Sequence, residues 1–207
     1  MSLAPAQDPR AVPLQLIAPA DLDGWLAAQV PPIRAWVRAA GFEAGAGEVV
    51  VLPAPDGTVA GAVVGWGAPG RRRERFGLAA AAARLPAGVY ALQAEGVDLD
   101  PGIEALGWLL GGYRFDRYRA ARPADGAVLV CPAGVDAARM EWIAGAARLA
   151  QDLINTPARD MGPEALEAAF FALAASHGAE ATVIRSVRLA STPSGQTRST
   201  PRGVAVR

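Results

Sequence analysis

Apolar positions in this chain fall into short β-branched runs that alternate with segments in which apolar residues recur at helical spacing. The runs predict strands at 14–18, 49–53, 59–66, 89–93, 127–132 and 181–185. The second and third runs are joined across Asp56-Gly57, a pair that favours a tight hairpin turn. The sequence therefore predicts at least one antiparallel strand pair.

The segments between these runs carry helix signals. Asp21 is expected to cap a first helix, and Gly41 to end a second one in the left-handed conformation. Further helices are predicted over 76–85, over 101–113, from Asp136 to about Ile154, and from Gly162-Pro163 to about Ser176. Strands and helices in this order predict an α/β fold, with a layered mixed sheet flanked by helices.

Composition narrows the range of partners. The 207 residues carry 20 basic and 20 acidic side chains, and every basic one is arginine. A formal net charge of zero provides no general attraction to nucleic acid or to an anionic membrane, so nucleic-acid binding is not expected. A guanidinium stays protonated, so arginine cannot replace a lysine that must lose its proton to act as a base or a metal ligand.

Cys131 is the only cysteine and His177 the only histidine. This count excludes a disulfide framework and a zinc site built from cysteine and histidine. Cys131 lies in an apolar strand, where a buried core role is expected, and His177 lies at a helix end just before Gly178. With neither a leader-like amino terminus nor an apolar stretch long enough to cross a bilayer, the sequence predicts a cytoplasmic protein.

Two motifs allow a binding role beside a structural one. A cluster of arginines could contact phosphates or form a solvated loop, and it comprises Arg71, Arg72, Arg73 and Arg75. Glycines that follow a strand and precede a helix could cradle a phosphate, and they stand at 61, 65, 67 and 70. Their spacing matches neither the dinucleotide fingerprint nor the P-loop.

Other chemistry-bearing residues have a structural interpretation. Glu164 and Glu167 lie near a helix amino terminus, where negative charge opposes the positive end of the helix dipole. Four tryptophans fall on helix faces as expected core or interface anchors: Trp25, Trp36, Trp108 and Trp142. The residues themselves therefore indicate no catalytic, cofactor-binding or metal-binding site.

The segment ARLAQDLINTPARDMGPE at 147–164 resembles the linker of the leucyl aminopeptidase family, in which a helix ends in a DLVNTP-like sequence. EALGWLLGGYRFDRY at 104–118 is similar to a helix that precedes the last strands of the family's amino-terminal domain. Together these likenesses cover roughly residues 100–185.

The resemblance implies an aminopeptidase with two domains. The amino-terminal domain would have a macro-domain-like α/β fold, and a larger carboxy-terminal domain would hold two divalent metals, zinc or manganese, that activate a water and polarise the peptide carbonyl. Family members are typically hexamers. The family's lysine-containing metal segment, its Asp-Ser-Gly-Gly and its Asn-Thr-Asp-Ala-Glu-Gly-Arg motif do not occur here.

Four segments are expected along the chain. Residues 1–12 would be a disordered or vector-derived start, 13–145 the amino-terminal α/β domain, 146–185 linker helices and a strand leading toward the catalytic domain, and 186–207 an irregular tail. The tail shows no family pattern, which we interpret as truncation or a frameshift near residue 186.

The predicted function is that of the non-catalytic amino-terminal domain of a leucyl aminopeptidase-type metallopeptidase, inactive alone, whose partners are its own catalytic domain and further copies of the full-length enzyme. The alternative is a free-standing macro-like module that binds a nucleotide or ADP-ribose.

Overall fold

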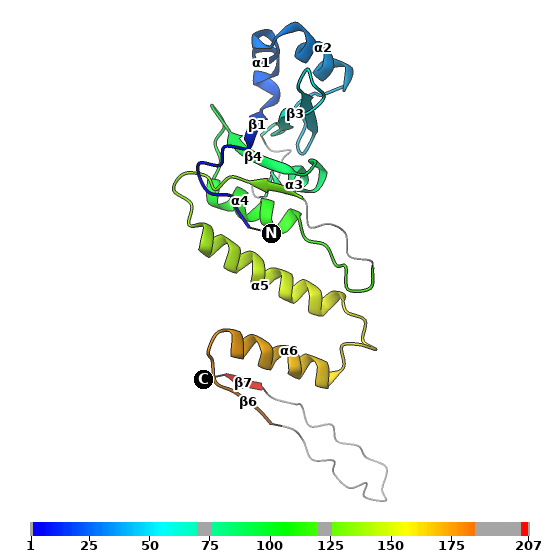
Figure 1. Ribbon diagram of the computed structural model, residues 1–207, viewed down its shortest axis with the longest axis vertical. Coiled ribbons are helices and arrows are strands. Elements are labelled where there is room, and N and C mark those ends of the chain that lie inside the picture. The colour runs from blue at the N-terminus through cyan, green and yellow to red at the C-terminus, as the bar shows by residue number, and fades with distance from the viewer. Residues whose placement is uncertain (1, 70–75, 120–125, 185–203, 207) are drawn as a thin grey trace, which may run out of the picture. The chain divides into compact units, whose positions relative to one another are not determined.

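A computed structural model describes residues 2–69, 76–119, 126–184 and 204–206 (Figure 1). Two compact units are present, Met1–Ala150 and Gln151–Arg207. The elements of the first unit are β1 (Ala11–Ile17), the 3-10 helix η1 (Pro19–Asp21), α1 (Leu22–Ala28), α2 (Pro31–Ala39), β2 (Val49–Pro53), β3 (Val59–Gly65), α3 (Ala79–Arg84), β4 (Gly88–Gln93), α4 (Pro101–Gly111) and β5 (Ala127–Leu129). The helix α5 (Ala137–Asn155) begins in the first unit and ends in the second, which also holds α6 (Pro163–Ser176), β6 (Ala181–Val183) and β7 (Val204–Val206).

A five-stranded mixed sheet forms the centre of the first unit, with strand order β2-β3-β1-β4-β5. β1 pairs in parallel with β3 and β4, and β4 pairs in parallel with β5. β2 pairs with β3 in the antiparallel direction, and Gly57 in the connecting turn has a φ of 84°. The predicted α/β class, the mixed sheet and the hairpin are confirmed.

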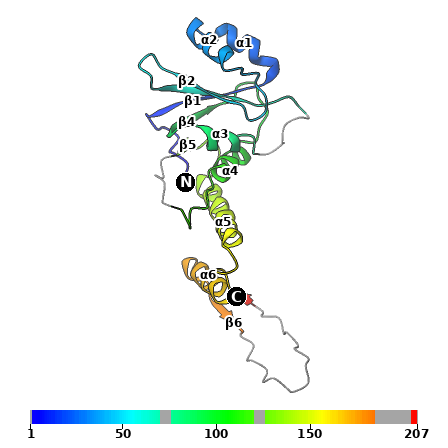
Figure 2. The same ribbon diagram turned by 90° about the vertical axis from the view of Figure 1, so that its right-hand side faces the viewer.

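Each face of the sheet packs against helices, because alternate side chains of a strand point to opposite faces. On one face, Leu14 and Val64 lie in a core with residues of α3 and α4, among them the fully buried Trp108. On the other face, Val63 lies in a smaller core with Leu26 of α1 and Val37 of α2. Figure 2 shows α1 and α2 on one side of the sheet and α3 and α4 on the other.

The first residues differ from the expected disordered start. Ala4 is buried, its amide donates to the Leu129 carbonyl at 2.8 Å, and its carbonyl accepts from the Cys131 amide at 2.9 Å. The Leu3 amide donates to the Glu141 carboxylate of α5 at 2.9 Å. These bonds satisfy backbone groups along the outer side of β5, a long-range effect that the polar, proline-containing sequence of the segment does not indicate.

Asp21 occupies the N-cap of α1 but makes no side-chain capping hydrogen bond. Its backbone is helical (φ −98°, ψ −8°) because η1 leads directly into α1, whereas a capping residue needs an extended backbone. Asp136 caps α5 as predicted, accepting from the Arg139 amide at 3.0 Å. Gly41, with a φ of 68°, follows α2 in the predicted left-handed conformation.

The second unit contains α6 and a short antiparallel pair, β6 with β7. The Thr156 hydroxyl donates to the Asp152 carbonyl at 2.7 Å at the end of α5. The segment expected to be an irregular tail thus includes a strand at 204–206, while residues 185–203, like the arginine cluster at 71–75, lie outside the described residues.

Candidate functional site

The space beside the described glycines after β3 is filled by other parts of the chain. A Cβ atom on Gly65 would overlap the backbone of Ala44 and Gly45, and one on Gly67 would lie 2.7 Å from the Ala46 Cβ. The Gly67 amide already donates to the Ala44 carbonyl at 3.0 Å. Close approach of the 44–46 loop, which only glycine permits, accounts for these residues without a phosphate.

Gly61 in β3 is also closely packed, because a Cβ atom there would lie 2.8 Å from the Pro13 carbonyl oxygen of β1. Gly70 lies outside the described residues. The three described glycines of the proposed cradle therefore let neighbouring backbones come together, and their amides are not presented to a ligand as a set.

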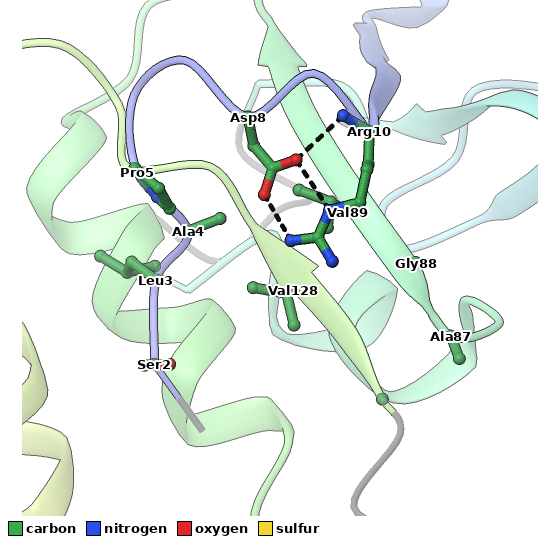
Figure 3. A pocket seen from close by; sticks show the side chains of 11 residues that line it. Ser2, Leu3, Ala4, Pro5, Asp8, Arg10, Ala87, Gly88, Val89 and Val128 are labelled. Carbon is green, nitrogen blue, oxygen red and sulfur yellow. Dashed lines mark hydrogen bonds and ion pairs between the residues drawn. The ribbon is translucent and has the colours of Figure 1, made fainter.

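A shallow pocket of about 610 Å³ lies between the amino-terminal segment and the sheet (Figure 3). It is lined by Ser2, Leu3, Ala4, Pro5, Asp8, Arg10, Ala87, Gly88, Val89, Gly126 and Val128. Gly88 and Gly126 stand at the amino ends of the parallel strands β4 and β5. Ligands of open α/β sheets bind beyond the carboxyl ends of the strands, at the opposite edge.

The charged groups of this pocket neutralise one another. Arg10 donates from Nη2 to Asp8 Oδ2 at 2.7 Å and from Nε to Asp8 Oδ1 at 3.0 Å. The hydrogen bonds from Arg10 lower the pKa of Asp8 to about 2, so the carboxylate is ionised at neutral pH. This bidentate pair closes one wall of the pocket (Figure 3) and offers neither a base nor a nucleophile.

Cys131 was expected in a buried strand but is half-buried and lies beyond the end of β5, while His177 lies at a helix end as expected. The Cys131 thiol donates to the Val135 carbonyl at 3.4 Å, and burial, with smaller contributions from Glu141 and Asp136, raises its pKa. A raised pKa disfavours the thiolate that a nucleophile requires. His177 is the C-cap residue of α6, followed by Gly178 with a φ of 62°.

Three of the four tryptophans donate their indole N–H to the chain itself. Trp25 donates to the Gln15 side chain at 2.7 Å, Trp36 to the Val51 carbonyl at 2.9 Å and Trp108 to the Ala127 carbonyl at 3.2 Å. Trp142 is 75% exposed on α5. The predicted role as core or interface anchors fits Trp108, which is fully buried, whereas Trp36 lies at a sheet edge.

The sequence patterns did not indicate the buried carboxylate of Glu104. Glu104 in α4 is only 2% exposed and accepts from the Leu78 amide at 2.8 Å, so it satisfies the backbone at the start of α3. Glu164 lies in the first turn of α6, as predicted. In both units a carboxylate thus lies at the amino terminus of a helix, where negative charge is favourable.

Within the described ranges, no group of three or more histidine, cysteine, aspartate or glutamate side chains is placed to hold a metal ion. No described helix is long and apolar enough to span a membrane. The geometry defines a mixed α/β domain whose polar groups stabilise its own strands and helix ends.

A family model for the amino-terminal domain of M17 aminopeptidases matches residues 12–132, more than half of the chain. The chain belongs to the M17 aminopeptidase family and carries its amino-terminal domain. This confirms the resemblance found in the sequence.

A curated relative and solved structures are also similar to this chain. A probable cytosol aminopeptidase of Streptomyces coelicolor is 31% identical over 188 residues, covering 73% of this chain and 36% of the relative. The cytosol aminopeptidase of Coxiella burnetii superposes with a TM-score of 0.73 at 28% identity, and the match covers 87% of this chain and 39% of that protein. The bottromycin maturation enzyme BotP in complex with Mn gives a TM-score of 0.62 at 27% identity, and the match covers 88% of this chain and 40% of that protein. The chain spans two fifths or less of each relative.

Proposed function

We propose that this chain serves as the non-catalytic amino-terminal part of a leucyl aminopeptidase-type enzyme, which removes amino-terminal residues from peptides. The observation that carries this proposal is the family match over 12–132, in a chain that spans only 36–40% of its relatives. The residue inventory supports it, because the sequence has no lysine and the described residues bring no metal ligands together.

Catalysis would then reside in a carboxy-terminal domain with two divalent metals. The manganese complex of BotP supports manganese as one metal of the parent enzyme, and zinc is the other candidate. Such a pair activates a bridging water and polarises the peptide carbonyl. None of the side chains described in this chain is assigned a step of that reaction.

Residues 146–185 would lead toward the catalytic domain. Several large apolar side chains of this segment are exposed, namely Ile154, Leu166, Phe171, Leu173 and Ile184. Apolar surface of this kind is stabilised when a partner covers it. The partner proposed here is the parent enzyme's own catalytic domain, in a cytoplasmic homo-oligomer such as a hexamer, and the cytosolic name of the Streptomyces relative supports that location.

A nucleotide-binding macro-like module remains the rival function. Its strongest motif, the glycine loop after β3, is filled by the 44–46 backbone, and the pocket lies at the amino ends of β4 and β5. Titration of the purified chain with ADP-ribose in a calorimeter is expected to give no heat beyond dilution. Saturable binding in the micromolar range would favour the module and count against a purely structural domain.

A further inference from the structure

β2 forms one edge of the sheet, because it is the terminal strand in the order β2-β3-β1-β4-β5. The Gly65 amide donates to the Glu48 carbonyl at 2.9 Å, and Val50 lies opposite Val63 in the next alternate pair. Hydrogen-bonded and non-hydrogen-bonded pairs alternate in an antiparallel ladder. Val49 and Val51 therefore direct their backbone N–H and C=O groups away from β3, along the outer edge.

Trp36 of α2 lies across this edge. Its indole Nε1 donates to the Val51 carbonyl oxygen at 2.9 Å, and the residue is 51% exposed. The next residue, Val37, is fully buried in the core between α2 and the sheet and fixes the helix in place. The anchored helix thus holds a large aromatic ring beside the strand and uses one of its outward acceptors.

The sequence of the edge strand makes such cover necessary. β2 reads VVVLP, a β-branched run without charge, and an unpaired edge of this composition is a template for another strand. Natural proteins commonly protect edges with lysine, which this chain lacks altogether. Pro53 removes one donor at the end of β2, and the Trp36 indole occupies an acceptor near the middle.

The opposite edge of the sheet is protected in another way. Ala4 forms a parallel bridge with Val130, and its backbone bonds with Leu129 and Cys131 cover the outer side of β5. β2 has no corresponding segment among the described residues, which leaves Trp36 as its cover.

We propose that Trp36 closes the β2 edge against antiparallel pairing with β2 of a second copy of this chain. A second copy is the partner that fits, because the same strand can pair with itself about a two-fold axis. The net charge of zero provides little repulsion between copies, and the VVVLP strand carries no charge to oppose its own approach.

The test compares Trp36→Ala with Trp142→Ala, a matched loss of an exposed indole on α5. Light scattering coupled to size exclusion measures molar mass, and amide hydrogen exchange reports on Val49 and Val51. The expected result for Trp36→Ala is a concentration-dependent doubling of the wild-type mass together with slower exchange at both amides, while Trp142→Ala matches wild type. A Trp36→Ala variant with the wild-type mass overturns the proposal, as does a higher mass with unchanged exchange at Val49 and Val51.

Trp36→Phe keeps an aromatic ring and removes only the hydrogen-bond donor. This variant is expected to dimerise at higher concentration than Trp36→Ala, with the same two amides slowed. If circular dichroism shows that Trp36→Ala is unfolded, Trp36→Phe decides the question, and a folded Trp36→Phe with the wild-type mass at every concentration contradicts the role of the indole bond.

Discussion

Replacement of Trp108 by alanine is expected to lower the free energy of unfolding of the chain by about 3–5 kcal/mol. Trp108 has no solvent exposure, its ring centroid lies 6.2 Å from that of Tyr90, and its indole donates to the Ala127 carbonyl at 3.2 Å. Truncation leaves a cavity between α4 and the sheet and removes the donor from a buried carbonyl. Domains are stable by only about 5–15 kcal/mol, so this one change removes a large share.

Urea unfolding followed by circular dichroism measures the effect. Trp108→Phe keeps most of the ring volume and loses the hydrogen bond, so an intermediate loss is expected. Trp142→Ala removes the same side chain from an exposed position and is expected to change stability by less than about 0.5 kcal/mol. Equal losses for Trp108→Ala and Trp142→Ala would contradict a core between α4 and the sheet that depends on Trp108.

Gly111→Ala is expected to destabilise the chain by about 1–3 kcal/mol, the usual cost of inserting an atom into a filled space. A Cβ atom on Gly111 would overlap the carbonyl group of Ala79 at the start of α3. One turn earlier, Gly107 has the backbone of Phe76 at 2.7 Å from the same position. The two glycines lie on one side of α4 and allow the chain at 76–79 to approach it closely.

Gly145→Ala is the matched control, since a Cβ atom at this position in α5 meets nothing within 4 Å. Glycine in a helix is less favourable than alanine by about 0.5–1 kcal/mol, so this change is expected to stabilise the chain. The two variants should shift the midpoint of thermal unfolding in opposite directions. A stabilising Gly111→Ala would rule out the close approach of α3 and α4.

Local patterns in the sequence were sufficient for much of the fold. The β-branched runs gave β2 and β3, the Asp56-Gly57 turn gave their hairpin, and Asp136 caps α5 through the Arg139 amide as expected. These features depend on residues within a few positions of one another, where turn and capping preferences act directly.

Features that depend on distant residues were missed. Glu104 bonds the amide of Leu78, 26 residues away, and Leu3 bonds Glu141 across 138 residues. No period or motif marks such contacts, because the fold brings the partners together. The glycines after β3 were interpreted as a candidate phosphate cradle because the sequence does not mark their packing partner. That partner, the 44–46 loop, lies earlier in the chain.

For function, too, local motifs in the sequence were informative, whereas contacts between distant residues were not. The motif at 147–164 and the helix at 104–118 indicated the family, which the match over 12–132 confirms. His177 was placed at a helix end and is the C-cap residue of α6, whereas Cys131, expected in a buried strand, is half-buried and follows the end of β5. The metal ligands of the parent enzyme stay a proposal, placed in the part of the relatives that lies outside the 36–40% covered by this chain.

This chain carries the family's amino-terminal domain, and we propose that catalysis belongs to another part of the parent enzyme. Hydrolysis of leucine p-nitroanilide by the purified chain, with manganese or zinc added, tests it most directly, and a complete M17 aminopeptidase assayed in parallel establishes that the conditions support turnover. No rate above the enzyme-free blank is expected with either metal. Metal-dependent release of p-nitroaniline that scales with the concentration of this chain would contradict it.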